Sequence, residues 1–150
     1  MSFEEIRVIT VVYLAVFLPL IIYWKYKSRL PKWIPSFYII SLVVCSLGWE
    51  LWFTYGWLDG DPVDLRRSEN LNKWLPKDIN WLLNSMGDAG AVLLGGTWLM
   101  WITHKKNLMI FKKWNWTAFV VLYIWCVSQN IFVEMFLYHD QLADGKPLSW

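Results

Sequence analysis

Charged residues, cysteine and histidine are scarce in this chain of 150 residues. Charged side chains make up 17% of the sequence and the net charge is only +2, so nothing indicates a nucleic-acid partner. Two cysteines and two histidines are too few for a disulfide-stabilised scaffold and do not suggest a zinc site. Cys45 and Cys126 fall inside apolar segments, where a free thiol acts as a small hydrophobic side chain. We therefore expect neither a metal centre nor a cofactor.

A basic segment is also missing ahead of the first apolar run, which follows Glu4 and Glu5. A cleavable signal peptide begins with a basic region and ends at small residues. This run ends instead in Tyr, Trp and Lys residues around Trp24, which are typical of a membrane interface. We therefore expect this apolar run to form a membrane helix and not a cleaved signal peptide.

Apolar residues, in contrast, make up 57% of the chain, and 13 residues are Trp. A helix crosses a bilayer in about 20 residues. Segments of this length cover roughly residues 6–24, 37–57, 79–102 and 114–138. Pro19 predicts a kink in the first helix, and Asp78 is placed to cap the third. The predicted fold is a single all-α membrane domain over residues 1–150, a four-transmembrane-helix bundle.

Basic residues gather in two of the connections, residues 25–36 and 103–113, which contain no acid. Most of the acids lie in the N-terminus and in residues 58–78. Basic connections face the cytoplasm, so we expect residues 25–36 and 103–113 there and both termini on the non-cytoplasmic side. Trp residues, Trp81 among them, fall near the expected interfaces and predict aromatic belts.

Glu50, Asp88 and Glu134 lie inside the apolar segments. An acid in the hydrocarbon core is costly and is a candidate functional residue by default. From the helix rise, Asp88 lies about 13 Å and Glu50 roughly 10 Å below the non-cytoplasmic end of its segment. All three acids are expected in the outer half of the membrane, with no Lys or Arg at their depth. Such carboxyl groups suit proton transfer, and we predict that these three are catalytic.

Further polar residues share the depth and helical spacing of the acids. Asn84 precedes Asp88 by one helical repeat, and Asn130 stands likewise to Glu134. We expect a polar pocket whose substrate-binding residues are Tyr13, Trp49, Phe53, Asn84, Trp125, Gln129 and Asn130. The aromatic rings could face a cationic intermediate, with packing as the alternative. For the amides, the alternative is hydrogen bonding between helices.

The stretch from Cys45 to Tyr55, Cys-Ser-Leu-Gly-Trp-Glu-Leu-Trp-Phe-Thr-Tyr, resembles a motif of the integral-membrane terpene cyclases of fungal meroterpenoid and indole-diterpene pathways. That motif reads Cys–Asn–aromatic–Ala–Trp–Glu–aliphatic–Val–Tyr. In that family, acidic residues protonate an epoxide or alkene and start cyclisation. The resemblance implies that Glu50 is the proton donor and that Trp49 is its motif neighbour.

The order of polar residues is also similar to the emopamil-binding family, which includes sterol Δ8–Δ7 isomerase. Glu50 with Phe53 comes first, then Asn84 with Asp88, and then Gln129 with Glu134. In that family, helices present acidic residues to a sterol. This chain has Ser46 where the isomerase has a histidine.

These features predict a small membrane enzyme that isomerises or cyclises a hydrophobic terpenoid, sterol or lipid. One alternative is a module or transporter subunit that binds a cation, a proton or an amine. A four-helix transporter would need to form a homo-oligomer. Another alternative is a structural subunit of a membrane complex, for which the three acids would be dispensable. The expected partners are the bilayer and a hydrophobic small molecule.

Overall fold

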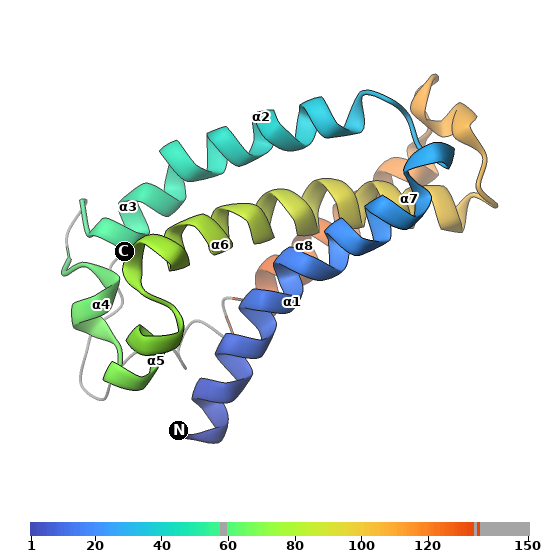
Figure 1. Cartoon of the computed structure of the whole chain (residues 1–150). Helices are drawn as coiled ribbons and strands as arrows, with labels where there is room; N and C mark the ends of the chain where they lie inside the picture. Colours follow the sequence, from blue (N-terminus) through green and yellow to red (C-terminus); the bar gives the residue numbers. More distant parts are fainter. Residues whose placement is uncertain (58–59, 134, 136–150) are drawn as a thin grey trace.

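The computed structural model describes residues 1–57, 60–133 and 135, and all regular structure within them is helical (Figure 1). Long helices lie side by side as a bundle. They are α1 (Phe3–Tyr26), α2 (Ile34–Leu47), α3 (Trp49–Tyr55), α6 (Lys77–Ala89), α7 (Gly96–Thr103) and α8 (Trp116–Phe132). A π-helical segment, η2 (Gly90–Gly95), joins α6 to α7 without a break. The all-helical class predicted from the sequence is confirmed.

Short helices occupy the two ends of the bundle. At one end, which we call the basic end (residues 25–36 and 103–115), lie η1 (Lys27–Arg29) and η3 (Leu108–Phe111). At the other end, α4 (Val63–Arg66) and α5 (Glu69–Trp74) form a small cap (Figure 1). The connection of residues 58–78 is therefore folded into helices over its described part.

Helix α6 lies between α1 and α2 and packs against both. Val8, Val12 and Val16 of α1 form one buried cluster with Leu83 of α6 and with Leu71 and Leu75 of the cap. Gly87 allows close approach, since a Cβ there would lie 3.4 Å from the Cβ of Ala15. A second cluster, Leu30, Ile34, Leu94 and Trp101, fills the bundle near the basic end. Helix α7 then packs against α8.

The helix boundaries differ from the predicted segments. The segment 37–57 is broken, because Gly48 has φ −95° and ψ −112° between α2 and α3. The segment 79–102 extends over residues 77–103 and contains the π-helical turn. Asp78 does not cap α6: the helix starts after Pro76, and the Asp78 carboxylate accepts a hydrogen bond from Tyr55 instead. Helix α1 continues through Pro19.

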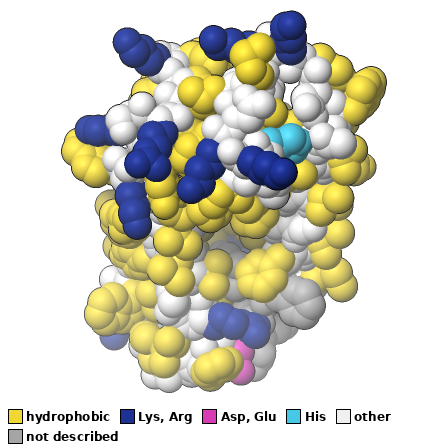
Figure 2. Space-filling view, turned by 90° about the vertical axis from the view of Figure 1, so that its right-hand side faces the viewer, with side chains coloured by type: hydrophobic (Ala, Val, Ile, Leu, Met, Phe, Trp, Pro, Cys, Tyr) yellow, Lys and Arg dark blue, Asp and Glu magenta, His cyan; other side chains and the backbone are white. Residues whose placement is uncertain are grey.

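Within the described residues, two helical stretches are long and apolar enough to cross a membrane, Phe3–Arg29 and Ile34–Tyr55. Only 11% and 17% of their apolar windows are buried within the bundle. Helix α8 is apolar but shorter over its described residues. The outer surface of the bundle is therefore largely hydrophobic along its length (Figure 2).

Candidate functional site

Glu50 is buried at the start of α3, where its side chain is only 5% exposed. The break at Gly48 separates this first turn of α3 from α2. Ser46 and Thr54, one helical repeat before and after Glu50 in the sequence, are buried as well. The glutamate therefore points into the bundle.

Helix α6 brings Asn84 and Asp88 to the Glu50 side chain. Both side chains make a hydrogen-bonding interaction with the Glu50 carboxyl group, and the Asp88 carboxylate also acts on it electrostatically. The Cys45 thiol of α2 interacts electrostatically with the carboxyl groups of both Asp88 and Glu50. Glu50 of α3 thus meets an amide and a second acid of α6, which are distant from it in the sequence.

One oxygen of Glu50 is not used within the bundle. The Oε2 atom is buried and has no hydrogen-bond partner among the described residues. Leaving a buried acceptor unsatisfied costs roughly 1–3 kcal/mol, so such an atom calls for an explanation. One explanation is that a substrate, or a proton shared between the carboxyl groups, forms the missing hydrogen bond to this atom.

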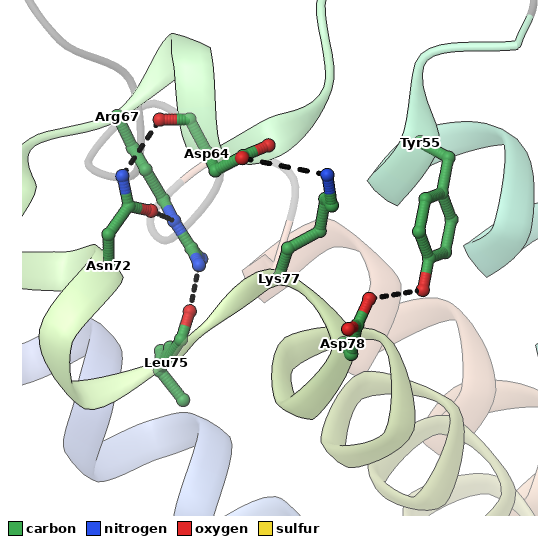
Figure 3. A network of polar contacts seen from close by, with 7 residues as sticks. All are labelled: Tyr55, Asp64, Arg67, Asn72, Leu75, Lys77 and Asp78. Atoms are coloured by element: carbon green, nitrogen blue, oxygen red, sulfur yellow. Dashed lines mark hydrogen bonds and ion pairs between the residues drawn. The ribbon is translucent and has the colours of Figure 1, made fainter.

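Two hydrogen bonds hold α6 against α2 and α3 around this group. The indole Nε1 of Trp81 donates to the Ser46 carbonyl oxygen over 2.8 Å. The Tyr55 hydroxyl donates to the Asp78 carboxylate over 2.7 Å (Figure 3). The sequence interpretation assigned Trp81 to an aromatic belt and did not foresee its contact with the backbone of α2.

Two arginines of the cap, Arg66 and Arg67, are buried where the cap contacts α3 and α6. Arg66 donates from Nη2 to the Phe53 carbonyl oxygen over 2.6 Å, and its guanidinium carbon lies 4.9 Å from the centre of the Phe53 ring. Phe53, predicted to bind substrate, therefore contacts the cap.

Arg67 is the centre of a polar network in the cap (Figure 3). It donates to Asn72 over 2.7 Å, to Asn80 over 2.9 Å and to the Leu75 carbonyl oxygen. Burial lowers the pKa of Arg67 to about 10, which still leaves the guanidinium charged at neutral pH. Asn72 in turn donates to the Asp64 carbonyl oxygen, and Lys77 lies 3.6 Å from the Asp64 carboxylate. Sequence reasoning missed both arginines.

The cap is also attached to α1. The Ser68 hydroxyl donates to the Glu5 carboxylate over 2.5 Å, and the Tyr13 hydroxyl donates to the Trp74 carbonyl oxygen over 3.2 Å. Tyr13, predicted to bind substrate, thus bonds to the cap. These contacts fix the cap over the end of the bundle that contains Glu50.

The remaining predicted site residues lie on other surfaces. The Trp49 side chain is exposed beside Glu50. Trp125 of α8 donates from Nε1 to the Ala91 carbonyl oxygen over 2.7 Å, and its ring lies against Gly95. Gln129 is half-buried, whereas Asn130 is exposed and donates to the Cys126 carbonyl oxygen. Glu134 lies outside the described residues.

The groups at this site that could bind a metal ion are carboxyl, amide and thiol groups. Within the described part of the chain, no group of three or more His, Cys, Asp or Glu side chains is arranged to hold a metal ion. The Glu50–Asp88 pair can donate, accept or share a proton, and Asn84 can orient the carboxyl group beside it.

Comparison of the chain with family models, curated proteins and solved structures gives no match.

Proposed function

We propose that the protein is a multi-pass integral-membrane enzyme that isomerises or cyclises a hydrophobic terpenoid, sterol or lipid. In this proposal, Glu50 and Asp88 carry the acid–base chemistry. The observation that carries it is the meeting of Glu50, Asn84 and Asp88 inside an apolar bundle. Acidic side chains in such surroundings are energetically costly, and they are therefore candidate functional residues by default.

The surface of the bundle supports the membrane location. Large apolar side chains point outward along α1, α2 and α8, among them Phe17, Val44 and Ile124. Monomeric soluble proteins rarely expose continuous apolar surfaces of this kind. A bilayer would cover them, with four crossings and with both termini on the non-cytoplasmic side.

The charges at the two ends support this orientation. All eight Lys and Arg residues of segments 25–36 and 103–113 are exposed, and these segments contain no acid (Figure 2). Such connections stay in the cytoplasm. The cap and the carboxyl pair then belong to the outer half of the membrane.

The chemistry follows from the pair of carboxyl groups. Glu50 in its neutral form would donate a proton to an alkene or epoxide of the substrate, and this step generates a carbocation. Asp88 as a carboxylate would stabilise the charge or accept a proton from carbon when the product forms. Asn84 would hold the Glu50 carboxyl group in place. The role of Glu134 stays a prediction.

A hydrophobic substrate would reach the pair from the bilayer. Gly48 interrupts the helix next to Glu50, and Trp49 and Trp52 are exposed beside it. Within a membrane, an interrupted helix is tolerated where it borders a site or is buried in protein. The Trp rings would offer apolar contact to the substrate and π-faces to a cation.

Solvent deuterium gives a test that does not require the product to be known. The full chain, reconstituted in lipid nanodiscs in D₂O, is incubated with a panel of isoprenoid epoxides, alkenes and sterols. We expect turnover in one substrate class: protonation of an alkene leaves deuterium bound to carbon, which mass spectrometry detects, whereas opening of an epoxide places the deuteron on the new hydroxyl oxygen and is detected as an isomeric product separated by chromatography. Glu50→Gln and Asp88→Asn should each reduce the rate by about 10²–10⁴-fold.

Glu69→Gln is the matched control, because Glu69 is exposed on α5 and undergoes the same chemical change. It should behave as the unmodified protein does. The proposal is wrong if Glu50→Gln folds normally and keeps the full rate. Binding of a hydrophobic amine without any deuterium transfer would favour the binding-module alternative. Loss of assembly in both carboxyl variants would favour a structural subunit.

A further inference from the structure

A hollow at the basic end is distinct from the carboxyl pair. It has a volume of about 300 Å³ and lies between α7, η3 and the first turns of α8. Its lining is mostly apolar and includes Met100, Ile110, Ala118 and Leu122. Lys112 and Lys113 also line it, and both are exposed to solvent. The hollow thus combines an apolar interior with two cationic side chains at its edge.

The surroundings of the hollow are strongly cationic. Lys and Arg side chains gather on this end of the molecule (Figure 2). Lys105 and Lys106 precede η3, and Lys25, Lys27, Arg29 and Lys32 come from the connection between α1 and α2. Because these segments contain no acid, the positive charge is not compensated locally. An anion near this end is attracted toward the hollow.

Exposed aromatic rings mark the border of the same region. Trp114 and Trp116 flank the start of α8, are exposed, and pack edge to face with their ring centres 5.1 Å apart. Tryptophan prefers the level of lipid headgroups, where one side of the ring is apolar and the other is wet. The mouth of the hollow therefore lies at headgroup level if the bundle spans a bilayer.

We propose that this hollow binds an anionic phospholipid. The phosphate and headgroup lie between Lys112 and Lys113, and an acyl chain enters the apolar space between α7 and α8. A basic pocket between helices on the cytoplasmic side suits such a lipid. A zwitterionic lipid would bring no net negative charge to the two lysines, and a small soluble anion would leave the apolar lining unfilled.

This inference relies on the membrane location in the proposed function, but not on the chemistry of Glu50 and Asp88. The lining residues of the hollow do not include Glu50, Asn84 or Asp88. Lipid binding and deuterium transfer can therefore be measured independently. Glu50→Gln should leave lipid binding unchanged, whether or not it abolishes turnover.

The test is a lipid titration of the full chain in detergent, followed by native mass spectrometry. The probes are dioleoyl phosphatidylglycerol, dioleoyl phosphatidylcholine and glycerol 3-phosphate. We expect phosphatidylglycerol to bind at least tenfold more tightly than phosphatidylcholine. The double variant Lys112→Gln/Lys113→Gln should weaken phosphatidylglycerol binding by about 30-fold, given the usual contribution of a lysine near an anionic lipid.

The double variant Arg29→Gln/Lys32→Gln is the matched control. It removes the same charge from the same end of the molecule, but neither residue lines the hollow. It should weaken binding by no more than about threefold. An equal loss in both double variants would show diffuse surface attraction and overturn the proposal. Equal affinity for phosphatidylcholine, or equally tight binding of glycerol 3-phosphate, would overturn it as well.

Discussion

Buried polar side chains in this molecule are of two kinds. Arg67 donates a hydrogen bond from each of its three guanidinium nitrogens, to Asn72, Asn80 and the Leu75 carbonyl oxygen, so its neighbours explain its burial. Glu50 is equally buried, yet its Oε2 atom has no hydrogen-bond partner among the described residues. A buried group whose bonds are complete stabilises a fold, whereas an unsatisfied buried atom calls for an explanation, as it also does at Thr54 Oγ1 and Asn80 Nδ2. In the proposed function, Arg67 serves stability and Glu50 serves the chemistry.

Arg67→Met should lower the free energy of unfolding by about 3 kcal/mol, because it leaves the acceptors on Asn72, Asn80 and Leu75 without their donor. Arg67→Lys should recover only part of this loss, since an ammonium group cannot reach all three acceptors at once. Denaturant unfolding in one fixed detergent gives the comparison. Lys73→Met on the exposed face of α5 is the control, expected within about 0.5 kcal/mol of the unmodified protein.

Trp125→Phe should cost about 1 kcal/mol, because it removes the donor to the Ala91 carbonyl oxygen but keeps most of the ring. Trp125→Ala should cost more, about 3–5 kcal/mol, because the contact with Gly95 is lost too. Thermal unfolding followed by circular dichroism measures both. Trp24→Phe, at a largely exposed ring, provides the reference for a Trp-to-Phe change. Equal effects at the two positions would contradict the assigned role of the indole N–H group.

At the scale of elements, the break between α2 and α3 is the feature that aims Glu50 at α6. Gly48 makes it possible, since a Cβ at this position would lie 2.9 Å from the Val44 carbonyl oxygen. That oxygen belongs to the backbone and has little room to move. Any residue with a Cβ at position 48 would therefore displace the break between α2 and α3, and Glu50 would move with it.

Gly48→Ala should destabilise the protein by about 1–3 kcal/mol and reduce turnover even where the fold survives. Gly87→Ala is the matched control on α6, because its Cβ would make ordinary contact at 3.4 Å with Ala15. Unfolding and deuterium incorporation are measured on both variants. A neutral Gly48→Ala would show that the break does not position the acid.

Sequence periodicity predicted that Asn84 and Asp88 lie on the same face of α6, because they stand one helical repeat apart. This placement depends only on the local geometry of the helix. Periodicity did not predict Arg66 and Arg67, since a loop has no period and their burial depends on residues distant in the sequence. The π-helical turn and the break at Gly48 were missed as well, because both are local departures from the regular repeat on which the prediction relied.

For the whole molecule, the outward apolar surface and the uneven charge of the two ends support the proposed direction through a bilayer. The basic end would lie in the cytoplasm, and the cap of α4 and α5 would lie on the opposite side. In the described part of the bundle, an apolar cluster around Ile34 and Trp101 fills the interior near the basic end. This arrangement suits a site that opens to one side or to the lipid better than a transport path.

Single cysteines test this direction in a variant whose own thiols are removed by Cys45→Ala and Cys126→Ala. A membrane-impermeant maleimide added to sealed cells should label Asp61→Cys and should leave Lys105→Cys unlabelled. Lys105→Cys should react only after the membrane is permeabilised. Both residues are exposed in the structure, so burial cannot account for a difference. The opposite pattern would reverse the proposed topology.

The attachment of the cap to three different helices has a consequence for biosynthesis. Ser68 bonds to Glu5 of α1, Arg66 bonds to the Phe53 carbonyl oxygen of α3, and Arg67 bonds to Asn80 of α6. The ribosome makes α1 and α3 before the cap, and α6 after it. Until α6 has been synthesised, Arg67 lacks its Asn80 acceptor, and the cap has only its attachments to α1 and α3. The full set of attachments therefore forms only after α6 has emerged from the ribosome.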